Sequence, residues 1–260
     1  MPDRSGPRLF VSDDLAAGGA VTLSSGQAHY LKNVMRLGPG APVVLFNGRD
    51  GEWSGQVDDL RRGGGTVAVG RQRRPQAVEP DVWLLFAPIK RAPLDFMIQK
   101  AVELGVSRLC PVLTRHTDVA RVNLERARST VMEAAEQCER LTLPEVAAPA
   151  PLFDVLAAWP AGRSLILCAE AGPARPMAEI LEGFIPDDGG KPPEMAVLVG
   201  PEGGFETSEL DGIRKLPFVT SAGLGPRVLR AETAALAALV CWQSVLGDWH
   251  TCRVQPTEAT

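Results

Sequence analysis

One stretch of the sequence decides the fold: Met195-Ala196-Val197-Leu198-Val199-Gly200-Pro201-Glu202-Gly203-Gly204-Phe205-Glu206-Thr207-Ser208-Glu209. Its first five residues are a continuous apolar run of strand length, which is typical of a strand buried on both faces of a parallel sheet. A loop with three glycines follows, and a helix is expected from Thr207 to Leu216. A buried strand, a glycine-rich loop and a helix in this order predict an α/β domain.

The alternation of strand and helix extends in both directions from this stretch, beginning at Asp81. Apolar runs predict further strands at residues 82–87, 106–113, 165–169 and 219–224. Apolar residues at helical spacing predict further helices at residues 94–104, 123–141, 177–184 and 230–246. Such alternation indicates a mostly parallel sheet flanked by helices.

The first 75 residues follow another pattern, in which short strands are separated by turn-forming residues. Strands are expected at residues 8–11, 20–23, 42–46, 52–57 and 66–69, with a short helix within 25–37. The connectors Asn47–Gly51 and Arg62–Gly65 have the composition of hairpin loops. These features predict a small β-barrel, and Arg73–Pro80, with its two prolines, is expected to be a linker. The predicted domains are therefore residues 1–75 and 76–260.

Charge is divided unevenly between these two parts. The chain has 27 Lys and Arg against 31 Asp and Glu, a net charge of −4, and 45% hydrophobic residues, which is typical of a folded globular protein. Residues 1–75 hold ten basic and seven acidic side chains, a net of +3, which leaves 17 and 24, a net of −7, for the rest. The net charge argues against a generally polycationic surface. The asymmetry favours a polyanion-binding module joined to an acidic body, with an uneven split by chance as the alternative.

The cysteines and the apolar runs bear on the compartment. Five cysteines, an odd number without a C-x-x-C pair, lie mostly in apolar runs and indicate small buried side chains in a reducing compartment. We expect a cytoplasmic protein without a membrane segment, because the sequence has neither a signal-like N-terminus nor an apolar run of about 18 residues. The three histidines are too scattered to form a metal site with these cysteines, so no metal is expected.

Three loops are the first candidates for a ligand site, because ligands of open parallel sheets bind beyond the carboxyl ends of the strands. They are Cys168–Gly172, Val199–Glu209 and Leu224–Ala234. The second loop matches neither G-x-G-x-x-G nor G-x-x-x-x-G-K-[ST], and it has Glu202 where a phosphate cradle needs a cation. A dinucleotide or nucleoside triphosphate is therefore disfavoured. Backbone groups made accessible by glycine suit instead a neutral or cationic heteroaromatic ligand, such as adenosine carrying an amino-acid tail.

Five motifs along the chain give a resemblance to a known family. They are His29–Leu37, Lys100–Val106, Glu133–Arg140, Val199–Phe205 followed by Glu209, and Leu224–Ala234. In this order they resemble the RsmE family of 16S ribosomal RNA uridine N3 methyltransferases over nearly the whole chain. The sequence departs from the family at Arg115-His116-Thr117, where relatives often have Arg-Ser after an acidic residue, and this departure concerns the substrate side of the site.

The resemblance implies a fold, a reaction and partners. The fold would be a PUA-like β-barrel followed by a SPOUT domain, a trefoil-knotted α/β fold that binds S-adenosylmethionine and forms a homodimer through the knot region. Topological rules alone would discard the knot, because true knots are rare. The reaction would transfer a methyl group to N3 of a specific uridine in the 16S ribosomal RNA of the small ribosomal subunit.

By the same resemblance the three loops form the cofactor pocket, chiefly through backbone groups. The residues carried over are Cys168, Ala169, Glu170, Val199, Gly200, Pro201, Glu202, Gly203, Leu224, Gly225, Val228 and Leu229.

Methylation at uridine N3 requires loss of the imide proton, alignment with the sulfonium methyl group, and stabilisation of negative charge on the ring oxygens. Arg230, a permanent cation at the start of the last helix, is the candidate for stabilising O2 or O4 or for anchoring a phosphate. Glu232 or Glu202 is the candidate for receiving or orienting the imide proton. Alternatively, Arg230 and Glu232 only serve the start of the helix, where a carboxylate is favourable.

The candidates for RNA contact are mostly basic residues of the first domain. They are Arg8, Lys32, Arg36, Arg61, Arg62, Arg71, Arg73 and Arg74, together with Gln137 and Arg140 from a polar helical stripe. That stripe is alternatively a solvated face or a contact with a partner subunit. His29, Tyr30 and Trp53 are candidates for stacking on bases, although burial is favoured for Trp53.

Two other functions stay open. One is a catalytically idle RNA-binding assembly factor, against which the intact cofactor loops argue. The other keeps the enzyme class and methylates another RNA or another nucleobase atom. A measurement of cofactor binding tests the first, and mass spectrometry of the ribosomal RNA tests the second.

Overall fold

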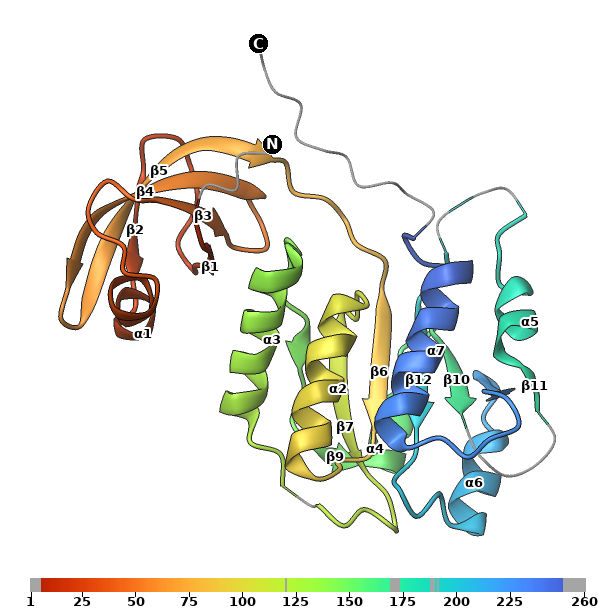
Figure 1. Ribbon diagram of the computed structural model, residues 1–260. Helices are drawn as coiled ribbons and strands as arrows, with labels where there is room; N and C mark the ends of the chain where they lie inside the picture. Colours follow the sequence, from red (N-terminus) through yellow and green to blue (C-terminus); the bar gives the residue numbers. More distant parts are fainter. Residues whose placement is uncertain (1–5, 120, 169–173, 188–189, 191, 250–260) are drawn as a thin grey trace. The chain divides into compact units, whose positions relative to one another are not determined.

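The computed structural model describes residues 6–119, 121–168, 174–187, 190 and 192–249 (Figure 1). These residues form two compact units. The N-terminal unit contains the described residues up to Val78 together with Ala135–Leu143, and the C-terminal unit contains Glu79–Ala134 and the described residues from Pro144 onward. The predicted domains are contiguous in the chain, whereas these units are interleaved.

The N-terminal unit is built on a five-stranded sheet with the order β1-β3-β4-β5-β2. Its elements are β1 (Arg8–Phe10), β2 (Ala20–Leu23), α1 (Ser25–His29), the π-helix η1 (Tyr30–Val34), β3 (Pro42–Phe46), β4 (Glu52–Arg61) and β5 (Gly64–Arg74). β1 pairs with β3 in parallel, and the other neighbouring strands are antiparallel. Leu9, Val21, Leu31, Leu45 and Val67 belong to its hydrophobic core.

β5 continues further than the sequence pattern indicates. Arg74 pairs with Glu52 across the ladder between β4 and β5, so the prediction that the linker begins at Arg73 was wrong. The strand ends at Arg74, because the next residue, Pro75, has no N–H to donate to a ladder. The guanidinium of Arg74 also donates to Glu52 Oε2 over 2.6 Å, and this bond holds the end of the strand in place.

The C-terminal unit is built on a sheet with the order β11-β13-β10-β12-β6-β7-β8, and β9 also pairs with β7. Its strands are β6 (Val82–Phe86), β7 (Arg108–Leu113), β8 (Glu145–Val146), β9 (Ala150–Pro151), β10 (Ser164–Cys168), β11 (Arg175–Pro176), β12 (Met195–Val199) and β13 (Val219–Gly223). Each pairing between these described strands is parallel. The predicted mostly parallel sheet is therefore confirmed.

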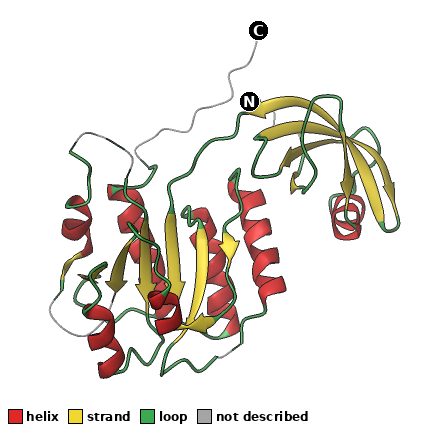
Figure 2. Cartoon of the chain, turned by 180° about the vertical axis from the view of Figure 1, so that it is seen from behind, coloured by secondary structure: helices red, strands yellow, loops and turns green. Residues whose placement is uncertain are grey.

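Helices flank this sheet on both sides (Figure 2). They are α2 (Arg91–Glu103), α3 (Leu124–Cys138), α4 (Leu152–Ala157), α5 (Met177–Glu182), α6 (Thr207–Arg214) and α7 (Ala231–Val245). Leu152 of α4 and Leu210 and Ile213 of α6 share one core cluster with Leu85 and Leu198 of the sheet. α2 and α7 pack against each other, and α7 also packs against β12.

Some short elements and several helix ends, that of α3 among them, differ from the sequence expectations. The two-residue strands β8, β9 and β11 and the six-residue helix α4 were not predicted, because such short segments carry no measurable periodicity. α3 ends at Cys138 rather than at the expected Leu141, since Glu139 adopts a left-handed backbone conformation with φ of 63°. Among the helices that the structure describes, none has the length and apolarity needed to cross a bilayer.

Candidate functional site

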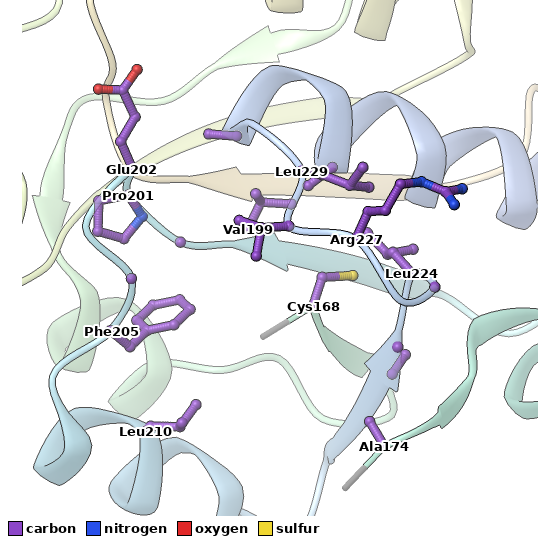
Figure 3. Close-up of a pocket in the computed structure, with 18 of the residues that line it drawn as sticks. Cys168, Ala174, Val199, Pro201, Glu202, Phe205, Leu210, Leu224, Arg227 and Leu229 are labelled. Atoms are coloured by element: carbon purple, nitrogen blue, oxygen red, sulfur yellow. The ribbon is translucent and has the colours of Figure 1, made fainter. Parts of the chain in front are cut away.

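A cavity of about 460 Å³ lies where three neighbouring parallel strands end (Figure 3). β10 lies between β12 and β13 in the sheet, so the segments that follow these strands meet at one edge. Cys168 ends β10, residues 199–205 follow β12, and residues 222–229 end and follow β13. The cavity therefore lies at the edge of the sheet where the sequence analysis placed a ligand site.

Most of the predicted cofactor residues line this cavity. They are Cys168, Val199, Gly200, Pro201, Glu202, Gly203, Leu224, Gly225, Val228 and Leu229. The other two, Ala169 and Glu170, lie outside the described residues. The fold thus brings segments that are distant in the sequence into one wall.

Other residues of the wall were not among the predicted cofactor residues. Phe205 and Leu210 add apolar surface, Arg227 adds a cation, and Ala231 and Ala234 come from the first turn of α7. Phe205 and Arg227 lie within the motifs of the second and third loops. Their direction was not predictable, because side chains in loops follow no fixed period, whereas those of strands and helices do.

Gly200 allows the second loop to pack closely. A Cβ atom at this position would lie 2.8 Å from the ring of Phe205, closer than real Cβ contacts, so any other residue would displace the ring. Gly204 and Gly225 have φ values of 70° and 100°, in the left-handed region that favours glycine. These glycines set the course of the second and third loops around the cavity.

The second loop is anchored to α6 and to the segment that follows β7. Glu206 and Glu209 form a capping box at the start of α6. Glu209 is buried, and its Oε1 also accepts a hydrogen bond of 2.8 Å from the backbone N–H of Arg115. His116 Nδ1 lies 3.1 Å from the carbonyl oxygen of Gly204. Arg115 and His116, at which the sequence departs from the RsmE pattern, therefore contact the glycine-rich loop and its helix.

The cavity combines a buried floor with charged groups at its rim. Burial raises the pKa of the Cys168 thiol to about 12, so this side chain is neutral at physiological pH and is not a nucleophile. Glu202 and Arg227 are exposed, and the Glu202 carboxylate points away from the cavity in Figure 3. Such a site suits the face of a heteroaromatic ring inside and polar or charged groups at the opening.

Arg230 and Glu232 lie beside the cavity, not in its wall. Arg230 is the N-cap residue of α7 and is exposed, while its neighbours Leu229 and Ala231 line the cavity. Glu232 follows in the first turn, and its Oε2 atom is buried with no hydrogen-bond partner among the described residues. The first turn of α7 therefore brings a cation and an unsatisfied carboxylate oxygen close to the cavity.

Three of the predicted RNA residues line a cleft of about 410 Å³ in the N-terminal unit. Lys32 belongs to η1, Arg61 ends β4, and Arg62 begins the turn toward β5. Lys32 Nζ donates to the carbonyl oxygen of Leu60, which ties the π-helix to the end of β4. His29, a candidate for stacking, also lines the cleft. The cleft thus combines three cations with an imidazole.

Arg8, Arg73 and Arg74 lie around a buried carboxylate. Glu52 is 6% exposed and accepts from Arg8 Nε over 2.9 Å and from Arg74 Nη2 over 2.6 Å. Arg73 Nε lies 3.9 Å from the other oxygen. The side chain of Arg8 is 8% exposed, so its guanidinium is enclosed and an RNA contact would require breaking these bonds.

The same cluster binds the last turn of α3 and the segment that follows it. Arg8 donates to the carbonyl oxygens of Ala135 and Arg140, and Arg74 donates to that of Glu139. Arg140 is itself buried, and its Nε donates to Thr142 Oγ1 over 3.2 Å. These hydrogen bonds indicate that Arg8, Arg74 and Arg140 stabilise the fold of the N-terminal unit.

The remaining predicted RNA residues are exposed. They are Arg36, Arg71 and Gln137. Arg36 has a left-handed φ of 56°, which is unusual for a residue other than glycine. Of the candidates for stacking, Tyr30 is 38% exposed and His29 is exposed, whereas Trp53 packs partly buried against the core.

Family models match both parts of the chain. A model described as RNA methyltransferase domain matches residues 77–243, and one described as RNA methyltransferase PUA domain matches residues 23–69. The first match covers more than half of the chain and includes the cavity residues of β12 and β13. The N-terminal unit accordingly contains a PUA domain.

Named relatives and solved structures agree with these models. The chain is 32% identical to the ribosomal RNA small subunit methyltransferase E of Rickettsia conorii, over 89% of this chain and 93% of that protein. The crystal structure of a ribosomal RNA small subunit methyltransferase E from Neisseria gonorrhoeae bound to S-adenosyl methionine superposes with a TM-score of 0.80 at 27% identity, covering 94% of this chain and 99% of that one. A methyltransferase from Legionella pneumophila with bound cofactor SAM gives a TM-score of 0.77 at 26% identity, over 92% and 97% of the two chains. From its sequence and its fold, the chain belongs to the ribosomal RNA small subunit methyltransferase E family.

Proposed function

We propose that this protein transfers a methyl group from S-adenosylmethionine to N3 of a specific uridine in 16S ribosomal RNA. The observation that carries the proposal is the cavity at the ends of β10, β12 and β13, which has about 460 Å³ for a ligand. The relatives from Neisseria gonorrhoeae and Legionella pneumophila, with the same fold, hold S-adenosylmethionine. The uridine N3 position rests on the motif resemblance.

The residues present fit this ligand. Val199, Leu224 and Phe205 offer an apolar surface for an adenine ring, and the glycines of the second and third loops expose backbone N–H and C=O groups for its polar edge and for the ribose. A site of this size is within the usual range of about 300–1,000 Å³ for small-molecule pockets. When bound, S-adenosylmethionine supplies an electrophilic methyl group on a sulfonium.

The task of this chain's own residues is to bind the uridine and to manage its charge. Arg230, exposed beside the cavity, stabilises negative charge on O2 or O4 of the ring or anchors a phosphate. A guanidinium at this position favours the N3-deprotonated form of the uridine, because that form carries the charge on these oxygens.

Glu232 is the stronger of the two candidates for the imide proton. Its Oε2 is buried and has no hydrogen-bond partner among the described residues, and an unsatisfied buried acceptor costs about 1–3 kcal/mol, which an N–H donor would remove. Glu202 is exposed and its carboxylate points away from the cavity. We therefore propose that Glu232 accepts or orients the proton and that Glu202 lies at the rim.

The N-terminal domain, residues 1–75, is proposed to bind RNA through the cleft of Lys32, Arg61 and Arg62, with Arg36, Arg71 and Tyr30 on its exposed surface. Residues 76–260 would form the methyltransferase domain. Its trefoil knot and a homodimer are proposed from the resemblance. Phe96 of α2 and Val240 of α7, two helices that pack together, are 46% and 39% exposed, and burial of both against a second copy would stabilise such a dimer. Light scattering of the purified protein gives the oligomeric state.

The reaction is tested by mass spectrometry of 16S ribosomal RNA from a strain that lacks the gene. We expect the loss of one N3-methyluridine, restored when the purified protein and S-adenosylmethionine are added to small subunits from that strain. Calorimetry with S-adenosylhomocysteine tests the cavity separately. Absence of binding would refute the methyltransferase, and loss of a different modified nucleoside would refute the uridine N3 position.

Arg230→Ala and Arg227→Ala separate the substrate side from the cofactor side. Removing a charge-stabilising group in the transition state typically lowers kcat by about 100-fold or more. We expect this loss for Arg230→Ala with unchanged affinity for S-adenosylhomocysteine, whereas Arg227→Ala, which alters the cavity wall, should weaken that affinity. Full methyl transfer by Arg230→Ala would contradict its assigned role.

A further inference from the structure

The C-terminal unit has a second cavity, a cleft of about 360 Å³ between the starts of α2 and α3. Three arginines surround it: Arg91 at the start of α2, Arg121 in the segment after β7, and Arg126 in the first turn of α3. Leu94 and Ile98 of α2 are buried and belong to its lining. The cleft therefore has an apolar lining and a cationic rim.

The residues that line this cleft carry more positive than negative charge. Asp95 is the one acidic residue among the lining residues of this cleft. It accepts from Arg126 Nε and Nη2 over 3.1 and 2.7 Å, and Arg91 Nε lies 4.0 Å from it. The hydrogen bonds from Arg126 hold the pKa of Asp95 below its ordinary value, so this carboxylate is charged at neutral pH and offsets one of the three arginines.

All three arginines are open to solvent. The side chains of Arg91 and Arg126 are 75% and 45% exposed, and Arg121 is also exposed. Asp95 fixes the orientation of the Arg126 guanidinium, which lowers the entropy lost when that group binds a ligand. Planar guanidinium groups match the oxygens of a phosphate, and an apolar floor beside them suits a ribose or an unstacked base.

The cleft lies at the same edge of the sheet as the cofactor cavity. β6 and β7 follow β12 in the order of this sheet and run parallel to it, and α2 and α3 begin at the edge where these strands end (Figure 1). Neighbouring strands lie about 4.8 Å apart. The loops after β6 and β7 are therefore one and two strand spacings from the glycine-rich loop after β12.

One chain segment forms part of both sites. After β7, the backbone N–H of Arg115 donates to Glu209 and His116 contacts the carbonyl oxygen of Gly204. A few residues later, Val119 and Arg121 line the cleft. The segment thus runs from the glycine-rich loop of the cofactor cavity to the arginine cleft.

We infer that this arginine cleft binds a phosphate of the single-stranded RNA next to the nucleotide that is methylated. The inference rests on the proposed function, since it takes RNA as the substrate of the neighbouring cavity. A base held at the cofactor cavity places the flanking backbone within a few strand spacings of it, where Arg91 and Arg121 meet it. The cleft would hold the RNA in register and leave the chemistry to the first turn of α7.

The test uses the full chain with Arg91→Gln and Arg121→Gln combined. Its probe is small ribosomal subunits from a strain that lacks the gene. Arg126 is left in place, because its loss would free Asp95. Arg128→Gln is the matched control, an exposed arginine of α3 that does not line the cleft. Affinity for S-adenosylhomocysteine, measured for each variant, shows that the C-terminal unit is folded.

We expect the double variant to bind the subunits at least tenfold more weakly, since a charge-assisted hydrogen bond of about 1.5 kcal/mol corresponds to that factor. KM for the subunits should rise by the same factor with kcat nearly unchanged. The slope of log affinity against log salt should decrease in magnitude by roughly 0.7 for each phosphate that the variant no longer neutralises. Arg91→Lys with Arg121→Lys, which keeps the charge, should recover part of the affinity.

A folded double variant with the affinity, KM and salt slope of Arg128→Gln would overturn the inference. Equally weakened binding of small subunits by Arg128→Gln would also overturn it, because binding would then depend on the overall positive charge of the surface and not on this cleft. Failure of the proposed function has a different result: the unaltered protein would bind no S-adenosylhomocysteine or would transfer no methyl group. In that case, the affinity of the double variant for small subunits would still show whether the cleft binds RNA.

Discussion

Glu52 is a buried carboxylate on which ion pairs from Arg8, Arg73 and Arg74 converge. Burial alone would raise the pKa of its carboxyl, but hydrogen bonds from Arg74 and Arg8 outweigh burial and hold that pKa below its ordinary value of 4.5. Burial lowers the pKa of Arg8, yet a guanidinium keeps its proton in folded proteins, so the ion pair persists at neutral pH. Arg8, which the charge count assigns to a basic surface, is thus enclosed and stabilises the fold.

We expect Glu52→Gln to destabilise the N-terminal unit by about 3 kcal/mol, because it leaves enclosed arginines without their anion. The measurement is unfolding in urea, monitored by hydrogen exchange of the backbone amides of β4 and β5. Asp14→Asn is the control: this carboxylate is 93% exposed and pairs with Arg49, and an exposed pair contributes about 0–1 kcal/mol. Equal stability of the two variants would contradict a structural role for Glu52.

The same carboxyl predicts a pH dependence. A lowered folded-state pKa means that the stabilisation is fully present above the unfolded value, near 4.5, and is lost as pH falls through the folded value. Between pH 7 and pH 3 the unaltered protein should therefore lose stability in this unit. In Glu52→Gln this part of the loss should be missing, which unfolding curves at several pH values would show.

Gly200 gives a residue-scale prediction for the cofactor cavity. In Gly200→Ala the added methyl group would lie 2.8 Å from the Phe205 ring, and overpacking of this kind costs about 1–3 kcal/mol. We expect a lower melting temperature and roughly tenfold weaker binding of S-adenosylhomocysteine, which corresponds to about 1.4 kcal/mol. Gly38→Ala, where no atom lies within 4 Å of the added carbon, should change neither quantity.

Among the elements, α6 connects the glycine-rich loop to the rest of the sheet edge through its first turn. Glu209 closes the capping box and accepts the backbone N–H of Arg115. We expect Glu209→Ala to cost about 1–2 kcal/mol in stability, the usual cost of losing a cap, and to weaken binding of S-adenosylhomocysteine. Asp211→Ala, an exposed carboxylate of the same helix, should have little effect in thermal unfolding or calorimetry.

The sequence predicted those strands and helices that have a regular pattern of apolar residues or a residue that ends the element. The apolar run of β12 and the helix from Thr207 were placed closely, because strands and helices have side-chain periods of their own. The end of β5 was misplaced, since arginine is a poor indicator of a buried ladder and its partner Glu52 is distant in the chain. The cavity loops were found because glycine marks them, whereas the arginine cleft was not, because Arg91, Arg121 and Arg126 belong to no common motif.

At the scale of the whole molecule, the division into units does not follow the order of the chain. Charge and composition predicted two parts joined near Pro75, and the family models match segments on either side of it. Neither pattern indicates that Ala135–Leu143 groups with the N-terminal unit. Three of the hydrogen bonds that join this segment to Arg8 and Arg74 are accepted by carbonyl oxygens, which every residue has.

This grouping predicts a pattern of hydrogen exchange. In mild urea, the amides of residues 136–143 should become exposed together with those of β3, β4 and β5, while β6 and β12 stay protected. Glu52→Gln should shift the first group and leave the second unchanged. Exchange of residues 136–143 in step with β6 and β12 would show that this segment belongs energetically to the sheet of the C-terminal unit.

The interleaving also has a consequence for synthesis. Residues up to Val78 leave the ribosome before Ala135–Leu143 exist, and at 5–20 residues per second the 65 residues between positions 78 and 143 take roughly 3 to 13 s. During this interval Arg8 and Arg74 have Glu52 as a partner but lack the carbonyl oxygens of Ala135, Glu139 and Arg140. The N-terminal part of the nascent chain therefore lacks these hydrogen bonds until Ala135–Leu143 has been synthesised, and that segment is synthesised within the sequence of the C-terminal unit.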